Sequence, residues 1–107
     1  MNIASVLPAA PTSATVQQIS GTSFELNWDA QAGVDGFVIA YATAEGTTIT
    51  NVELPADRTS YQVTNLVENT DYQFFLYSET NGLRTRAQLT LLDPDTTAPG
   101  TKSIRLV

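Results

Sequence analysis

Residues 66–82 read LVENTDYQFFLYSETNG, and this stretch decides the fold class. A polar segment, residues 67–71, leads into the run YQFFLY at residues 72–77, which contains four aromatic residues, one leucine and one glutamine. Aromatic side chains favour β-strands. The Asn81-Gly82 pair that follows is typical of a two-residue type I′ turn, because both central positions of that turn need a positive φ. The stretch therefore predicts a strand followed by a tight hairpin.

The remainder of residues 11–92 shows the same organisation, with short runs at period two separated by turn residues. In residues 23–28 the side chains of Phe24, Leu26 and Trp28 fall on one face. In the last run Ala87 and Leu89 are expected to share a face with Leu91. We expect strands at residues 14–19, 23–28, 37–41, 48–54, 60–64, 72–77 and 85–92. This number and spacing predict an all-β fold, a seven-stranded immunoglobulin-like sandwich of two antiparallel sheets.

Composition narrows the classes of function. The 107 residues are enough for one ordinary domain, and 42% hydrophobic with 15% charged residues is too apolar for a disordered chain. Eleven acidic and five basic residues leave a net charge of −6, and the basic residues are not clustered, which argues against nucleic acid as a partner. There is no cysteine, no pattern of a signal peptide in residues 1–10 and no run of about 20 apolar residues, so we expect no disulfide and no membrane insertion.

Catalytic chemistry has few candidates in this sequence. Histidine is absent, so the commonest general base and the commonest zinc ligand are missing, and we expect no catalytic residue, metal or cofactor. Paired carboxylates remain conceivable at Asp29 with Asp35, or at Asp93 with Asp95. Aspartates in loops between strands usually hydrogen-bond local backbone, so we interpret the first pair as loop residues. Asp93 and Asp95 flank Pro94, and a solvated linker is favoured there over a calcium site.

The ordered set of motifs resembles a fibronectin type III domain over roughly residues 11–92. Pro11 opens the first strand, Trp28 is a single core tryptophan, residues 36–41 carry inward aromatics including Tyr41, and Tyr72 follows Leu66 by six positions. The resemblance implies structural roles for Trp28, Tyr41, Leu66 and Tyr72. The last two would form a tyrosine corner, in which the tyrosine hydroxyl bonds to nearby backbone. Residues 67–69 lack the Pro and Gly of many members, and residues 79–84 lack the Arg-Gly-Asp tripeptide of the adhesive members.

The family topology also implies an unusual outer surface. If Tyr72 points inward, then Phe75 and Tyr77 point outward, and pairing with the strand at residues 37–41 puts them beside Val38 and Ala40. We predict an interface at these four residues, occupied by a protein partner, a second copy of the chain or a neighbouring domain of the parent protein. The alternative is that the stem of Arg84 or Arg86 covers the two rings.

The ends of the chain are typical of linkers. We divide the sequence into an N-terminal linker at residues 1–10, the domain at residues 11–92, and a segment at residues 93–107 that combines a Pro- and Thr-rich linker with a possible first strand of a following domain. The favoured function is a non-catalytic spacer and protein-interaction module of a larger secreted or cell-surface protein, of bacterial type. The alternative is a carbohydrate-binding accessory module of a polysaccharide-degrading enzyme, with Phe75 and Tyr77 stacking on sugars.

Overall fold

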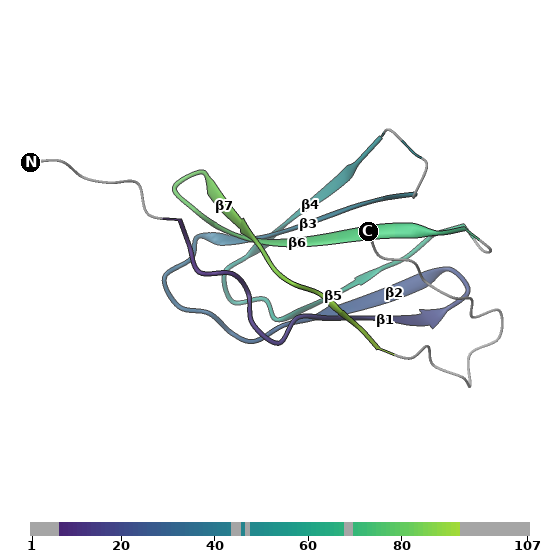
Figure 1. The fold of residues 1–107 in the computed structure, drawn as a ribbon, viewed down its shortest axis with the longest axis horizontal. Helices are drawn as coiled ribbons and strands as arrows, with labels where there is room; N and C mark the ends of the chain where they lie inside the picture. The colour runs from purple at the N-terminus through teal and green to yellow at the C-terminus, as the bar shows by residue number, and fades with distance from the viewer. Residues whose placement is uncertain (1–6, 44–45, 47, 68–69, 93–107) are drawn as a thin grey trace, which may run out of the picture.

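A computed structural model describes residues 7–43, 46, 48–67 and 70–92. Within these residues the chain forms eight strands and no helix, arranged as two facing sheets (Figure 1). The all-β sandwich expected from the period-two pattern is confirmed. The strands are β1 (Thr15–Ser20), β2 (Ser23–Asn27), β3 (Gly36–Thr43), β4 (Thr50–Pro55), β5 (Ser60–Val63), β6 (Tyr72–Thr80), β7 (Leu83–Arg86) and β8 (Thr90–Leu91).

Each sheet holds four strands. One sheet has the order β5-β2-β1-β8 and the other the order β4-β3-β6-β7. Every pairing is antiparallel except that between β1 and β8, which is parallel. In Figure 1 the sheet with β3 and β6 lies above the sheet with β1, β2 and β5. Strands β4 and β5 are therefore edge strands, one in each sheet.

The space between the sheets is filled by side chains that alternate along the strands. Phe24 and Leu26 of β2 are buried as predicted, and Phe37 and Ile39 of β3 and Leu76 of β6 are buried as well. Burying apolar surface in this way stabilises the fold by roughly 25 cal/mol for each Å² removed from water. The buried core cluster comprises Ala14, Val16, Phe24, Leu26, Trp28, Phe37, Ile39, Leu54, Val63, Leu66, Tyr72, Phe74, Leu76 and Ala87.

Aromatic rings join the two sheets across the core. The ring of Phe24 on β2 meets that of Phe74 on β6 edge to face, with centroids 4.9 Å apart. Trp28, directly after β2, is 4% exposed and lies 5.4 Å from the Phe37 ring. Such tilted and edge-to-face contacts suit the charge distribution of aromatic rings. Trp28 is thus a core residue and offers no platform for a ligand.

The last predicted strand, residues 85–92, is divided between the two sheets. The N–H of Ala87 still donates to Leu76 O on β6, at 2.7 Å, whereas the N–H of Thr90 donates to Ala14 O of the other sheet, at 3.0 Å. The chain crosses between them, which raises the strand count from seven to eight. Ala87 is buried and Leu89 packs against the core, but Leu91 is 40% exposed. Leu91 pairs in register with the core residue Val16 of β1, so it lies on the inward face of the second sheet, at an exposed edge.

The hairpin between β6 and β7 has the predicted turn. Asn81 and Gly82 both adopt positive φ, 52° and 80° respectively, as a type I′ turn requires. The Asp35 carboxylate accepts a hydrogen bond of 2.8 Å from the N–H of Asn81. The turn is therefore tied to the loop that precedes β3.

The described part of the expected N-terminal linker contacts the sandwich. The carbonyl of Ala9 accepts hydrogen bonds of 2.6 Å from the hydroxyl of Ser78 and from the side-chain amide of Gln31. Ser78 is fully buried on β6. Residues 1–6 and the predicted linker and strand at residues 93–107 lie outside the described residues.

Candidate functional site

The corner before β6 sets which way the side chains of this strand point. Tyr72 is 6% exposed, and its hydroxyl accepts a 2.8 Å hydrogen bond from the backbone N–H of Val67. Leu66 is buried, and its N–H donates to Thr22 O at 2.9 Å. The hydrogen bond expected of a tyrosine corner is therefore present, although residues 68–69 of the corner lie outside the described residues. With Tyr72 inward, Phe74, Leu76 and Ser78 are also inward, and the residues between them face outward.

The strand register brings the four predicted interface residues together. Val38 on β3 pairs with Tyr77 on β6, and Ala40 pairs with Phe75. Val38 and Ala40 do not belong to the core cluster between the sheets. They therefore lie on the outer face of this sheet, as the family topology predicted. We call this set the outer face: Val38, Ala40, Phe75 and Tyr77.

The predicted exposure of the outer face holds only in part. Val38 is 1% exposed and Ala40 is 5% exposed, so the expectation that both contact solvent is wrong. Val38 lies between Tyr77 and Glu53 of the neighbouring strands, and Ala40 lies between Phe75 and Asn51. Both side chains are shorter than these neighbours. The two rings, with centroids 6.4 Å apart, are half-buried. The surface offered to solvent is thus aromatic at its centre and polar at its margin.

Arginine contributes to this surface, although through a guanidinium group over one ring and not through a stem across both rings. The guanidinium carbon of Arg86 lies 5.5 Å from the centroid of the Phe75 ring, within the range of a cation–π contact. Arg86 also pairs with Tyr77 across the strands. Arg84 does not cover the rings, because its Nε forms a 2.9 Å ion pair with Glu79. Of the two arginines, Arg86 is the one that lies against the outer face in the described part of the chain.

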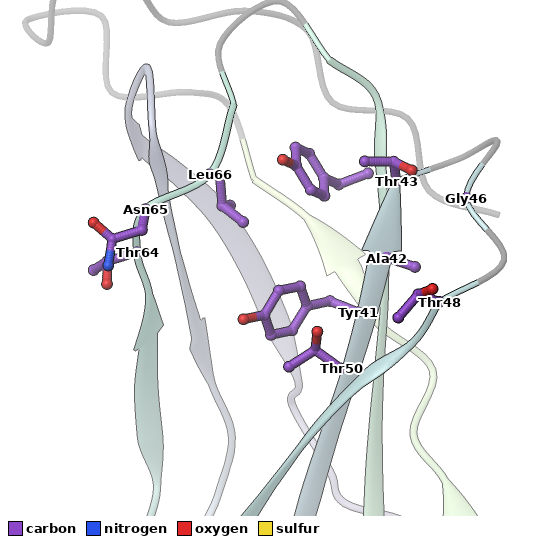
Figure 2. Close-up of a pocket in the computed structure, with 10 residues that line it drawn as sticks. Tyr41, Ala42, Thr43, Gly46, Thr48, Thr50, Thr64, Asn65 and Leu66 are labelled. Carbon is purple, nitrogen blue, oxygen red and sulfur yellow. The ribbon is translucent and has the colours of Figure 1, made fainter.

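A pocket that sequence reasoning missed lies at one end of the sandwich. It has a volume of about 510 Å³ and opens between edge strands β4 and β5 of the two sheets, beside the β3–β4 connection. Figure 2 shows the Tyr41 ring projecting from β3 toward residues 64–66, with Thr50 beside it. The lining residues are Tyr41, Ala42, Thr43, Gly46, Thr48, Thr50, Thr64, Asn65, Leu66 and Tyr72. Thr50 and Thr64 belong to different strand segments of the sequence, so no local sequence pattern predicts the pocket.

The carboxylates of Asp29 and Asp35, a conceivable catalytic pair in the sequence, form hydrogen bonds within the loops. Asp29 accepts a 3.3 Å hydrogen bond from the Thr12 hydroxyl, and Asp35 caps the Asn81 turn. Within the described residues no group of three or more acidic, histidine or cysteine side chains is placed to hold a metal ion. Asp93 and Asp95 lie outside that part of the chain. The helix-free described region also contains no helical membrane span.

Two mainly antiparallel sheets, a core tryptophan and a tyrosine corner define an immunoglobulin-like β-sandwich. A family model described as the fibronectin type III domain matches residues 9–91. The chain belongs to the fibronectin type III family.

Solved structures of the same fold accompany this match. The FN1–FN3 domains of chicken CNTN1 superpose with a TM-score of 0.69 at 20% identity, covering 76% of this chain and 30% of that one. The chain thus spans less than a third of that structure. An FN3 domain of human collagen XX gives 0.68 at 22% identity, covering 82% and 92%. A Fn3-like protein from Clostridium thermocellum gives 0.64 at 25% identity, covering 84% and 97%.

Proposed function

We propose that this domain is a non-catalytic module of a larger secreted or cell-surface protein, where it spaces neighbouring domains and contacts a protein through its outer face. The observation that carries the proposal is the combination of Phe75 and Tyr77 on the inner strand β6 with Arg86 on the neighbouring edge strand β7. Aromatic residues and arginine are the types enriched in protein interfaces and in their energetically dominant positions. The domain acts by position and contact, with no chemical step.

The spacer role is supported by the shape of the fold and by its relatives. A sandwich with one continuous core behaves as a rigid unit. Among the solved relatives, the CNTN1 structure contains several domains of this family in one chain. The Pro- and Thr-rich composition of residues 93–100 also supports a position between domains, since such segments favour extended backbone. A bacterial protein of this fold is among the relatives, in keeping with a bacterial surface protein.

The carbohydrate-binding alternative is less favoured at the outer face. A sugar stacks on an aromatic ring whose flat surface is free, but Arg86 already lies over Phe75. A protein partner can engage the same surface through ring edges and the guanidinium group without displacing Arg86.

Solution mass tests the interface. We expect the parent chain, at high concentration or mixed with its neighbouring domains, to form a complex that a Phe75→Ser, Tyr77→Ser double variant loses. Analytical ultracentrifugation measures the mass, and Gln62→Ser on the outer surface of the other sheet is the matched control. If the parent and double variant are both monomeric and bind the neighbouring domains equally, the proposal is wrong.

A further inference from the structure

The pocket beside β4 and β5 carries chemistry that the protein-contact function does not use. Six of the ten lining residues bear hydroxyl groups: Tyr41, Thr43, Thr48, Thr50, Thr64 and Tyr72. Asn65 adds an amide, and none of the ten is charged. Its volume of about 510 Å³ falls within the range of small-molecule sites, roughly 300–1,000 Å³. The pocket includes none of the four residues of the outer face.

Tyr41 supplies an aromatic wall that is held in place. Its ring stacks on Phe74 with centroids 6.0 Å apart and an angle of 30° between the ring planes. The ring is half-buried and also lines the pocket. A ring fixed from one side loses little conformational entropy when a ligand stacks against it. Tyr41 is therefore suited to contact the flat apolar surface of a ligand.

The polar groups around Tyr41 are available for hydrogen bonding. Thr50 on β4 and Thr64 after β5 are both exposed, and Asn65 beside Thr64 is exposed as well. Among the described residues none of these three side chains has a hydrogen-bond partner in the protein. The Tyr41 hydroxyl likewise has none within that part of the chain. A ligand at this site meets several donors and acceptors that otherwise bind water.

The chemistry of the lining selects the class of ligand. A phosphate or carboxylate would find no cationic side chain among the lining residues, in a chain whose net charge is −6. A purely apolar ligand would leave threonine and asparagine groups desolvated without partners, which is unfavourable. A pyranose ring has an apolar C–H face and a rim of neutral hydroxyls, and this matches an aromatic wall with neutral polar groups around it. We propose that the pocket binds a neutral sugar unit of an oligosaccharide, stacked on Tyr41 and hydrogen-bonded by Thr50, Thr64 and Asn65.

An NMR titration of the full chain tests this site. The probes are the neutral trisaccharides cellotriose, mannotriose and N,N′,N″-triacetylchitotriose, with trigalacturonate as an acidic probe of similar size. We expect at least one neutral probe to give saturable amide shifts at residues 41–43, 48–50 and 64–66, with a millimolar Kd. Trigalacturonate should bind more weakly than that probe, because the site offers no positive charge.

Matched variants locate the binding. Thr50→Val and Thr64→Val keep the side-chain shape and remove one hydroxyl, and each should weaken binding roughly three- to tenfold, as expected for one lost hydrogen bond. Thr90→Val, on β8 at the opposite edge of the same sheet as β5, should bind as the parent does. Tyr41→Leu should abolish saturable shifts, and if that variant fails to fold, the two threonine variants decide.

Any one of four results would overturn the proposal, and the first three concern the probes. They are the absence of saturable shifts with all neutral probes, shifts centred on Phe75 and Tyr77 rather than on the pocket, or tighter binding of trigalacturonate than of every neutral probe. An unchanged affinity in both Thr50→Val and Thr64→Val would equally rule out the site. The solution-mass experiment on the outer face is independent of these outcomes.

Discussion

The hydroxyl of Tyr72 accepts a hydrogen bond from the N–H of Val67 across 2.8 Å, which closes the connection between the two sheets just before β6. The same tyrosine ring lies 6.2 Å from the Phe24 ring of the opposite sheet. One side chain thus fixes both the backbone of the connection and the packing beneath it. The inward orientation of Tyr72 also determines which side chains of β6 reach the outer face.

Replacing Tyr72 with phenylalanine should destabilise the domain. The ring packing is retained, but the N–H of Val67 loses its acceptor, and we expect the free energy of unfolding to fall by about 1–2 kcal/mol. Urea unfolding followed by circular dichroism measures the change. Tyr61→Phe is the control, because the Tyr61 hydroxyl has no hydrogen-bond partner among the described residues. An unfolding midpoint for Tyr72→Phe equal to that of the parent would argue against the corner.

Trp28 should matter through its volume rather than through its indole N–H. Within the described residues the buried Nε1 atom has no hydrogen-bond partner. Trp28→Ala leaves a cavity beside Phe37 and should cost about 3–5 kcal/mol of stability. Trp28→Phe keeps an aromatic ring against Phe37 and should cost clearly less. Equal losses for the two variants, measured by thermal and urea unfolding, would show that the N–H has a role that these residues do not reveal.

Gly36 is required where β3 passes close to β4. A Cβ atom at this position would lie 2.5 Å from the carbonyl oxygen of Leu54, and backbone cannot move aside as a flexible side chain can. In Gly36→Ala, crowding should lower the free energy of unfolding by about 1–3 kcal/mol. Alanine also makes the unfolded chain less flexible, which raises the free energy of unfolding by only roughly 0.4–1 kcal/mol, so we expect a net loss of stability.

The control for this prediction is Gly33→Asn in the preceding loop. Gly33 has a φ of +80° with open space around it, and asparagine tolerates that conformation. Its unfolding midpoint should stay near that of the parent. If Gly36→Ala unfolds at or above the parent midpoint, the close approach of β3 and β4 at Leu54 is not as the structure shows it.

The two donors to the Ala9 carbonyl should act together. Ser78→Ala and Gln31→Ala each leave one hydrogen bond at this oxygen, whereas the double variant removes both. We therefore expect the double variant to lose more stability than the sum of the single variants, by about 0.5 kcal/mol or more. A double-mutant cycle in urea measures this coupling. Strict additivity would mean that the segment at residues 7–10 is not held against β6 in solution.

The sequence predicts the strands well because their side chains alternate with little interruption. The period-two runs around Leu26 and Leu76 correctly identify which residues face the core. The split of residues 85–92 into β7 and β8 was not predictable in the same way. Both halves follow period two, so the change of sheet between Ala87 and Thr90 leaves no local signature.

The candidate sites depended more strongly on contacts between strands. Val38 and Ala40 were correctly placed on the outer face, but their burial depends on which side chains flank them in β4 and β6. The pocket depends on the edge strands of two different sheets meeting around Tyr41. A period-two pattern describes one strand at a time. It therefore predicts which face of a sheet a side chain lies on, but it does not predict a pocket between the edge strands of two sheets.

The parallel pairing of β1 and β8 has a mechanical consequence. Thr90 and Leu92 donate backbone hydrogen bonds to Ala14 and Val16, so the first and last strands of the described domain lie side by side and run in the same direction. A force that pulls the two ends of the domain apart slides these strands along each other. It loads their hydrogen bonds simultaneously, in shear, instead of opening them one at a time. Within a longer chain under tension, this short pairing would be the clamp that must yield before the sandwich extends.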